Sequence, residues 1–296
     1  MGQDVPLLTL RDGKVIPQLG LGTWQLSSDE CARLAGEAIR LGYRSFDTAQ
    51  SHGNEDGLGR AIQESGLKRD ELFVTSKLRN GAHRREEALR SFDATMTRLG
   101  LEQIDLFLIH WPVPAQDLYV EAWKTLVELQ QQGHIRSIGV SNFSIAHLER
   151  ITRETGVAPA VNQIELHPLL QQRDLRGYHL RRNIRIESWS PLGPGTANAA
   201  WWWTHGRSTP GSALEHPTIQ EIARKHGRSP AQIIIRWHLD DGLILFPKAG
   251  RPEHLAQNIA VFDFQLDAED MYRIEAMDSP ETGRIGADPD HWNEIY

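Results

Sequence analysis

Cysteine is nearly absent from this sequence: Cys31 is the one cysteine among 296 residues. A single thiol cannot form an internal disulfide bond, and low cysteine content is typical of proteins in a reducing compartment. The apolar runs are much shorter than the roughly 20 residues that cross a bilayer. The opening residues, MGQDVPLLTL, also lack the basic region and apolar core of a secretory signal peptide. We therefore expect a cytoplasmic protein with no membrane partner.

Clusters of basic residues are missing as well. The 32 lysine and arginine residues are outnumbered by 39 aspartate and glutamate residues, which gives a formal net charge of −7. No basic run is long enough to follow a nucleic-acid backbone, so we exclude nucleic acid as a partner. The Gly-x-Gly-x-x-Gly fingerprint of a Rossmann fold does not precede any predicted helix.

What the sequence does contain is a series of eight short apolar runs separated by amphipathic stretches. Most of the runs are continuously apolar, which is typical of parallel strands buried on both faces. The stretches between them have helical spacing, as in Leu89, Phe92, Met96 and Leu99. The runs are LGLGTW (19–24), SFDTA (45–49), LFVTSKL (72–78), IDLFLIHWP (104–112), IRSIGVSNF (135–143), AVNQIEL (160–166), RIESWSP (185–191) and LILFPKA (243–249).

Eight strands alternating with helices predict an α/β fold, a closed (β/α)8 TIM barrel formed by one domain over residues 1–296. A doubly wound open sheet is the alternative. A β-hairpin over 7–20, with Asp12-Gly13 at its turn, is predicted to precede the first strand. Residues 194–215 and the tail 279–296 do not fit the repeating unit. We expect them to form long loops on the C-terminal face of the barrel, because long loops in compact domains are usually functional or disordered.

Polar side chains stand where several predicted strands end. Asp47, Lys77 and His110 end the second, third and fourth strands, and further polar residues follow in the fifth and sixth: Ser141, Asn142, Asn162 and Gln163. Barrel active sites lie where the strands end, so these groups are expected to converge at the barrel mouth and to perturb each other's pKa values.

Several blocks of the sequence resemble the signature segments of the aldo-keto reductases, in the same order and spacing. The blocks are GYRSFDTAQSHGNEDGLGRAI, TSKL, IHWP, GVSNF, NQIELHP and SWSPLG, and the resemblance runs from GLGTW to the end of the chain. It is closest to the bacterial diketo-gluconate reductase-like branch. The resemblance implies the barrel fold and hydride transfer between NADPH and aldehydes or ketones, a small-molecule carbonyl substrate, and a monomer.

The resemblance also implies a catalytic set of aspartate, tyrosine, lysine and histidine. Asp47, Lys77 and His110 match, but the position of the tyrosine is occupied by His52. A neutral imidazole can donate a hydrogen bond. However, it is shorter than a phenol, and Lys77 disfavours a second positive charge. Three interpretations remain open: a reductase that uses His52 or a water held by it as the acid, a catalytically silent cofactor-binding module, and a surface histidine at an unrelated position.

For the cofactor, the resemblance implies that Ser141, Asn142 and Gln163 hold the nicotinamide carboxamide and that Trp189 stacks on the ring. Lys248 and Arg251 are expected to bind the 2′-phosphate of NADPH. Ala249 and His254 replace a serine and an arginine of the family, so NADH should be discriminated against only modestly. The remaining predicted cofactor contacts are Gly22, Thr23, Trp24, Ser190, Leu192 and, facing the adenine, Gln257 and Asn258.

Tryptophans dominate the predicted substrate pocket. Trp24 and Trp111 follow the first and fourth strands and are expected to form apolar walls. The further candidates are Trp201, Trp202 and Trp203, Tyr119 in the fourth loop and Trp292 in the tail. Arg79 could face an anionic group of the substrate. Asp47, His52 and His110 could together attract a divalent metal, but Lys77 opposes a dication there, and we predict no metal site.

Overall fold

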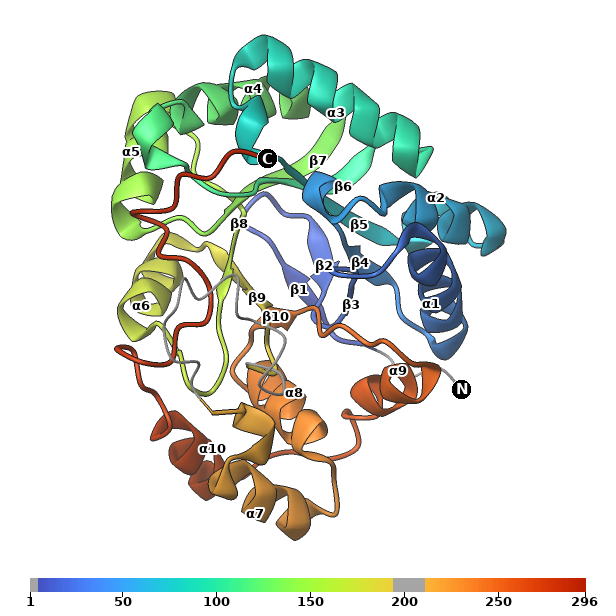
Figure 1. The fold of residues 1–296 in the computed structure, drawn as a ribbon, viewed down its shortest axis with the longest axis vertical. Helices are drawn as coiled ribbons and strands as arrows, with labels where there is room; N and C mark the ends of the chain where they lie inside the picture. The colour runs from blue at the N-terminus through green and yellow to red at the C-terminus, as the bar shows by residue number, and fades with distance from the viewer. Residues whose placement is uncertain (1–4, 194–210) are drawn as a thin grey trace.

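The computed structural model describes residues 5–193 and 211–296. Its main sheet is a ring of eight parallel strands in the order β10-β9-β8-β7-β6-β5-β4-β3 (Figure 1). The ring closes between its first and last strands, because Gly20 N donates to Leu245 O at 3.0 Å and Leu245 N donates to Gln18 O at 3.0 Å. The barrel is therefore confirmed over the open sheet. The strands are β3 Leu21–Gly22, β4 Ser45–Asp47, β5 Phe73–Leu78, β6 Ile104–Ile109, β7 Ile135–Ser141, β8 Val161–Glu165, β9 Arg185–Trp189 and β10 Ile244–Leu245.

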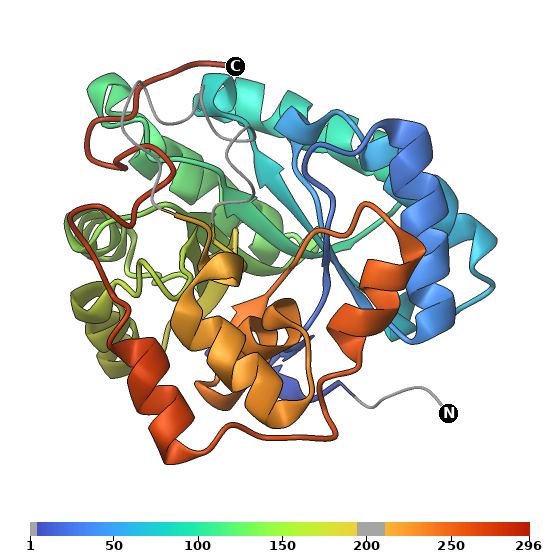
Figure 2. The same ribbon diagram turned by 60° about the horizontal axis from the view of Figure 1, so that its bottom comes forward.

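Helices surround this ring. One helix follows each of the strands from β3 to β8, whereas α7 and α8 precede β10, and α9 and α10 follow it. Figure 2 shows α7 and α10 side by side outside the ring. No helix in the described part of the chain is long and apolar enough to cross a membrane. The helices are α1 Ser28–Leu41, α2 Glu55–Glu64, α3 Arg85–Leu99, α4 Tyr119–Gln131, α5 Ile145–Thr155, α6 Arg173–Arg182, α7 Pro217–His226, α8 Pro230–Asp240, α9 Pro252–Ile259 and α10 Ala268–Glu275.

The helix limits follow from local sequence signals. Ser27 and Glu30 form a capping box at the start of α1, which ends at Gly42 in a left-handed conformation with φ of 103°. Ser229 caps α8 in the same way, with Pro230 at its first position. Short 3₁₀ helices punctuate the loops: η1 Gln50–His52, η2 Arg69–Glu71, η3 Asn80–Ala82, η4 Pro114–Gln116 and η5 Ala213–Glu215.

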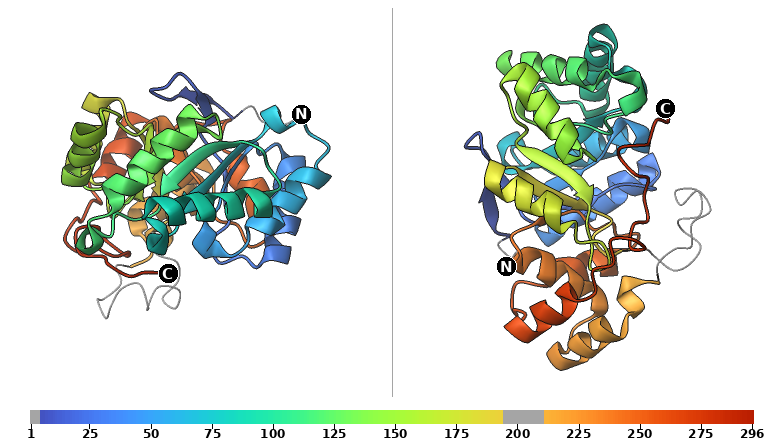
Figure 3. Two further views of the ribbon diagram at one scale, coloured as in Figure 1. Left: turned by 90° about the horizontal axis from the view of Figure 1, so that it is seen from above. Right: turned by 90° about the vertical axis from the view of Figure 1, so that its left-hand side faces the viewer.

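The predicted hairpin closes one end of the barrel. β1 Leu7–Thr9 pairs with β2 Val15–Pro17, and the turn between them has Gly13 at φ of 80°. Ile16 of the hairpin is buried in one apolar cluster with side chains from the barrel strands, including Leu106, Leu108 and Val161. The tail 279–296 runs along the opposite face (Figure 3). The hairpin therefore covers the N-terminal end of the barrel with apolar side chains.

Candidate active site

A buried ion pair joins β4 to β5 inside the barrel. Lys77 Nζ lies 2.6 Å from Asp47 Oδ1 and 2.7 Å from Oδ2, and it also donates to Thr48 O at 2.9 Å. Thr75 is the register partner of Asp47, so Lys77, two residues further along β5, projects from the same face of the sheet. The lysine is 1% exposed. A buried ammonium needs such a partner, because removing either charge would leave the other unpaired in a low-dielectric interior.

His52 lies beside this pair, at the end of η1. Its ring centroid is 6.3 Å from that of His110, and its Nδ1 is 3.4 Å from Thr23 Oγ1. Burial holds the pKa of His52 well below its ordinary value, and the positive charge of Lys77 and the proximity of His110 lower it further. The imidazole is therefore neutral at neutral pH.

Asn54 fixes the loop that carries His52. Its side-chain amide donates to Thr23 O and to Leu26 O, both at 2.8 Å. Its Oδ1 accepts hydrogen bonds from the hydroxyls of Thr48 at 2.8 Å and Thr23 at 3.2 Å. Asn54 is fully buried. We did not predict this role from the sequence, although a buried asparagine two residues after His52 is the kind of residue that fixes a loop.

His110 follows the end of β6 and shares the mouth with His52. Ser51 Oγ is 3.3 Å from its Nδ1, and its carbonyl accepts a hydrogen bond from Asn142 Nδ2 at 3.0 Å. Burial and the charge of Lys77 lower the pKa of His110 well below its ordinary value. The expected convergence of the strand-end groups is thus present: one ion pair and two neutral imidazoles. Lys77 contacts both oxygens of Asp47, and no group of three His, Cys, Asp or Glu side chains suited to a metal occurs among the described residues.

The residues expected at the carboxamide are linked by hydrogen bonds. Ser141 Oγ donates to Gln163 O at 2.9 Å, and Asn142 Nδ2 donates to Ser141 Oγ at 3.0 Å. Gln163 Nε2 donates both to Asp47 Oδ2 and to Glu187 Oε2, each at 2.9 Å. Both N–H groups of Gln163 thus point to carboxyl groups, and its Oε1 is left to accept.

Glu187 was missed from the sequence because it stands within an apolar run. Burial raises its pKa to about 8, and the nearby Asp47 carboxylate adds to this rise, whereas the Gln163 hydrogen bond and Lys77 oppose it. Its carboxyl group is consequently protonated at neutral pH.

The tail lies across the mouth and was not predicted in detail. Glu165 of β8 accepts hydrogen bonds from Ile285 N at 2.7 Å and Gly286 N at 2.8 Å. Further along, Trp292 packs on Trp111 with ring centroids 5.7 Å apart. The structure therefore brings these two predicted pocket residues together. Tyr296, which we had not singled out, places its ring 6.1 Å from that of His110.

Other candidates for the substrate pocket are distributed differently. Trp24 is half-buried beside Thr23. Tyr119 begins α4 and packs against α5, with its ring 5.2 Å from that of His147 and 5.1 Å from the Arg150 guanidinium. Arg79 is exposed, and its Nη1 donates to Tyr296 O at 3.3 Å. Trp201, Trp202 and Trp203 lie outside the described residues.

A positively charged segment precedes α9. Lys248 and Arg251 are exposed, as is His254 in the first turn of the helix, whereas Ala249 is buried. Lys248 and Gly22 form an isolated parallel β-bridge, so this segment lies next to β3, the first strand of the barrel. Of the two residues expected at the adenine, Gln257 is exposed and Asn258 is buried. Ser190 and Leu192 follow β9, where Ser190 has φ of 47°.

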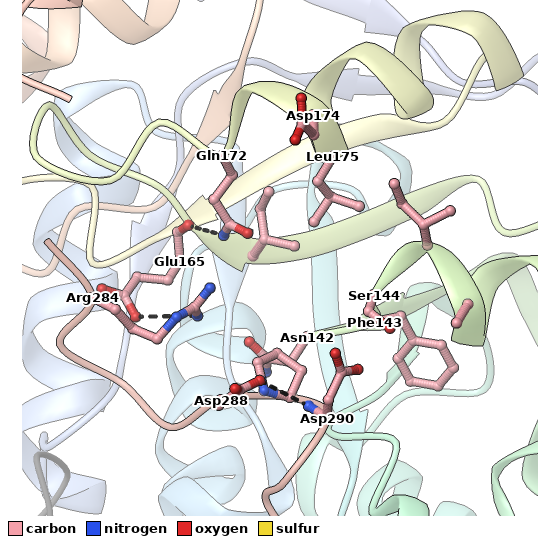
Figure 4. A pocket seen from close by; sticks show the side chains of 14 residues that line it. Asn142, Phe143, Ser144, Glu165, Gln172, Asp174, Leu175, Arg284, Asp288 and Asp290 are labelled. Carbon is pink, nitrogen blue, oxygen red and sulfur yellow. Dashed lines mark hydrogen bonds and ion pairs between the residues drawn. The ribbon is translucent and has the colours of Figure 1, made fainter. Parts of the chain in front are cut away.

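A cavity of about 370 Å³ lies beside the mouth, between the starts of α5 and α6 and the tail (Figure 4). It touches Asn142 but none of Asp47, His52, Lys77 and His110. Its lining has more acidic than basic side chains. Arg284 is the basic one, and the acidic ones are Glu165, Asp174, Asp288 and Asp290. Such a surface disfavours the phosphates of a nucleotide, in contrast to the segment before α9.

Known proteins match almost the whole chain. The model of the Aldo/keto reductase family matches residues 18–279. Methylglyoxal reductase DkgA of Escherichia coli O157:H7 is 47% identical over 287 residues, which are 97% of this chain and 98% of that protein. The crystal structure of Gox0644 in its apo form has a TM-score of 0.88 at 47% identity, and covers 97% of this chain and 98% of its own. A Gox0644 variant in complex with NADPH has a TM-score of 0.89 at 46% identity, covering 98% and 99%.

Proposed function

Since this chain belongs to the aldo/keto reductase family, we propose that it reduces small aldehydes and ketones, methylglyoxal among them, with NADPH as the hydride donor. The observation that carries the proposal is the buried Asp47–Lys77 pair with His110 and His52 at the barrel mouth. Diketo-gluconate is the second substrate to test, because the sequence blocks resemble that branch. All of these groups come from one chain, so we propose a monomer.

The polar groups of the mouth suit a nicotinamide cofactor. The N–H groups of a carboxamide need an acceptor, and Gln163 Oε1 offers one, because both N–H groups of Gln163 are used by carboxyl groups. The Ser141 hydroxyl would have to turn from Gln163 O to donate to the carboxamide oxygen. Gly22 lets the first strand pack closely on the segment after β10, since a Cβ there would lie 2.6 Å from Phe246 O. Lys248 and Arg251 offer two exposed cations for the 2′-phosphate. When bound, NADPH would supply the hydride for the carbonyl carbon.

The chain itself has to provide the proton for the carbonyl oxygen. Thr23 Oγ1 donates its own hydrogen to Asn54 Oδ1 and is left to accept from His52 Nδ1. This favours the His52 tautomer with the proton on Nδ1, which leaves Nε2 as an acceptor. We infer that a water held at His52 Nε2 gives one proton to the carbonyl oxygen, and that the hydroxide left behind is stabilised by the positive charge of Lys77 and takes up a proton from the solvent. Such a donor is weaker than a directly placed acid, so turnover should be slow.

NADPH titration by tryptophan fluorescence, followed by a turnover assay on methylglyoxal and diketo-gluconate, tests the proposal. We expect binding, together with slow loss of NADPH absorbance that depends on the carbonyl substrate. Lys77→Met serves as the control and should abolish the turnover that remains. Binding without any turnover would instead favour a catalytically silent cofactor-binding module. That function is compatible with a His52 whose Nε2 carries no proton to donate. The absence of binding would contradict both functions.

A further inference from the structure

Glu187 has no role in the proposed reduction, yet its side chain lies among the residues of the candidate active site. The residue is fully buried on β9, and its register partner on β8 is Gln163. Gln163 Nε2 lies 2.9 Å from both Glu187 Oε2 and Asp47 Oδ2, so one amide group bridges two carboxyl groups. Glu187 Oε1 has no hydrogen-bond partner among the described residues. A fully buried carboxyl with an unused oxygen calls for an explanation.

The charges around Glu187 leave it without a counter-ion. Asp47 faces it from β4 and Lys77 from β5, but these two charges already neutralise each other at 2.6 Å. On β10 its register partner is the apolar Ile244. The other carboxyl of β8, Glu165, is turned to the backbone of the tail and to His167. The proton therefore stays on Glu187 until its pKa, raised to about 8 by burial, is exceeded.

We propose that Glu187 is a positioning residue that couples the loss of one proton to the redox state of the bound nicotinamide. The inference rests on the proposed function, in which Gln163 Oε1 receives the carboxamide. Both N–H groups of Gln163 hold the carboxyl groups of Asp47 and Glu187, so the ring would lie on the opposite side of the same amide. The oxidised ring carries a positive charge and the reduced ring none. Ionised Glu187 therefore attracts NADP+ and leaves NADPH nearly unaffected.

The coupling has a definite direction. Binding of NADP+ releases a proton from the Glu187 carboxyl to the solvent, and NADPH binding leaves it in place. Because coupling is reciprocal, raising the pH must tighten NADP+ binding relative to NADPH. The 2′-phosphate also titrates, with a pKa near ~6, but it is common to both cofactors and cancels in the ratio of their dissociation constants.

The experiment measures both dissociation constants by tryptophan fluorescence between pH ~6.5 and ~9, which brackets the raised pKa of the carboxyl. For the natural chain we expect the ratio Kd(NADP+)/Kd(NADPH) to fall about fivefold over this range. In Glu187→Gln, which keeps an acceptor for Gln163, the ratio should change less than about twofold. Glu165→Gln is the matched control, a buried carboxyl of the neighbouring strand, and should retain the full change.

Calorimetry in two buffers of different ionisation enthalpy gives an independent measurement. At a pH near the pKa of Glu187, the natural chain should release a fraction of a proton on binding NADP+, and Glu187→Gln should release none. Two results would overturn the inference and leave the reductase proposal standing. In the first, both cofactors bind and the ratio Kd(NADP+)/Kd(NADPH) does not depend on pH. In the second, proton release persists in Glu187→Gln. Failure of the natural chain to bind either cofactor would overturn both.

Discussion

Trp189 donates its indole N–H to Asn142 Oδ1 at 2.7 Å. The residue expected to stack on the nicotinamide ring is thus joined directly to a residue expected to hold the carboxamide. Asn142 Nδ2 in turn contacts His110 O and Ser141 Oγ, so its amide connects β9 with the ends of β6 and β7. The orientation of Trp189 therefore affects several predicted cofactor contacts at once.

Gly286 of the tail sets how closely the chain can pack on Trp189. A Cβ at this position would lie 2.4 Å from Trp189 Cη2 and 3.0 Å from Glu165 Oε2. We expect Gly286→Ala to displace the indole and to weaken NADPH binding about tenfold, since such a clash costs ~1–3 kcal/mol. Fluorescence titration measures this. Gly36→Ala in α1, where the nearest side-chain atom to the added carbon is Arg40 Nη1 at 3.9 Å, is the control. Equal NADPH affinities in the two variants would contradict the role of Gly286.

Replacing His52 by tyrosine should restore a proton donor of the expected kind. We expect His52→Tyr to raise kcat for methylglyoxal about 100-fold, because a positioned general acid contributes ~10²–10⁴-fold. Its NADPH dissociation constant should change little. Steady-state kinetics and fluorescence titration give the two numbers, with His52→Phe as a control that fills the space without an acid. An unchanged or lower kcat in His52→Tyr would show that the tyrosine is not what this site lacks.

Cofactor preference should respond to position 254. His254 is exposed in the first turn of α9, close in sequence to Lys248 and Arg251. His254→Arg adds a guanidinium for the 2′-phosphate, and we expect the preference for NADPH over NADH to rise about fivefold, or roughly 1 kcal/mol for an exposed pair. Dissociation constants of both cofactors measure it. His134→Arg, which precedes β7 at the N-terminal end of the barrel, should leave the preference unchanged. If His254→Arg also left it unchanged, Lys248 and Arg251 would suffice.

The stability of the fold should depend on the protonation of Glu187. Its pKa is raised from 4.5 to about 8, so its contribution to stability is fully present below pH 4.5 and is lost as the pH rises through 8. Glu187→Gln removes this dependence. Between pH ~6 and ~9 the free energy of unfolding of the variant, relative to the natural chain, should therefore increase by on the order of 2 kcal/mol. Urea denaturation at the two pH values checks this, and a constant difference would contradict a neutral Glu187.

The fold was predictable from the sequence because its signal is repeated. Short apolar runs such as 106–109 are typical of buried strands, and their number and their alternation with helical stretches indicated a barrel. The convergence of Asp47, Lys77 and His110 followed from geometry, since parallel strands end on the same side. Their chemical roles remain predictions.

Other features depend on contacts that leave no local pattern. The tail is fixed by backbone N–H groups on Glu165, which any sequence could supply. Glu187 stood in an apolar run, and only the structure shows it sharing Gln163 with Asp47. Tyr119 was placed in a loop, but its ring packs on Phe143 and His147 because α4 begins with it.

The hairpin that covers one end of the barrel has a consequence for the order in which ligands bind and dissociate. Among the described residues, Ile16 and its neighbours fill that end, so we expect ligands to enter and leave through the mouth. Gln163 lies deep within it, whereas Trp111 and Trp292 stand nearer the tail. When two ligands enter through the same opening, the ligand that lies deeper must bind first and dissociate last. We therefore expect the nucleotide to load before the carbonyl compound and the alcohol to leave before the spent nucleotide.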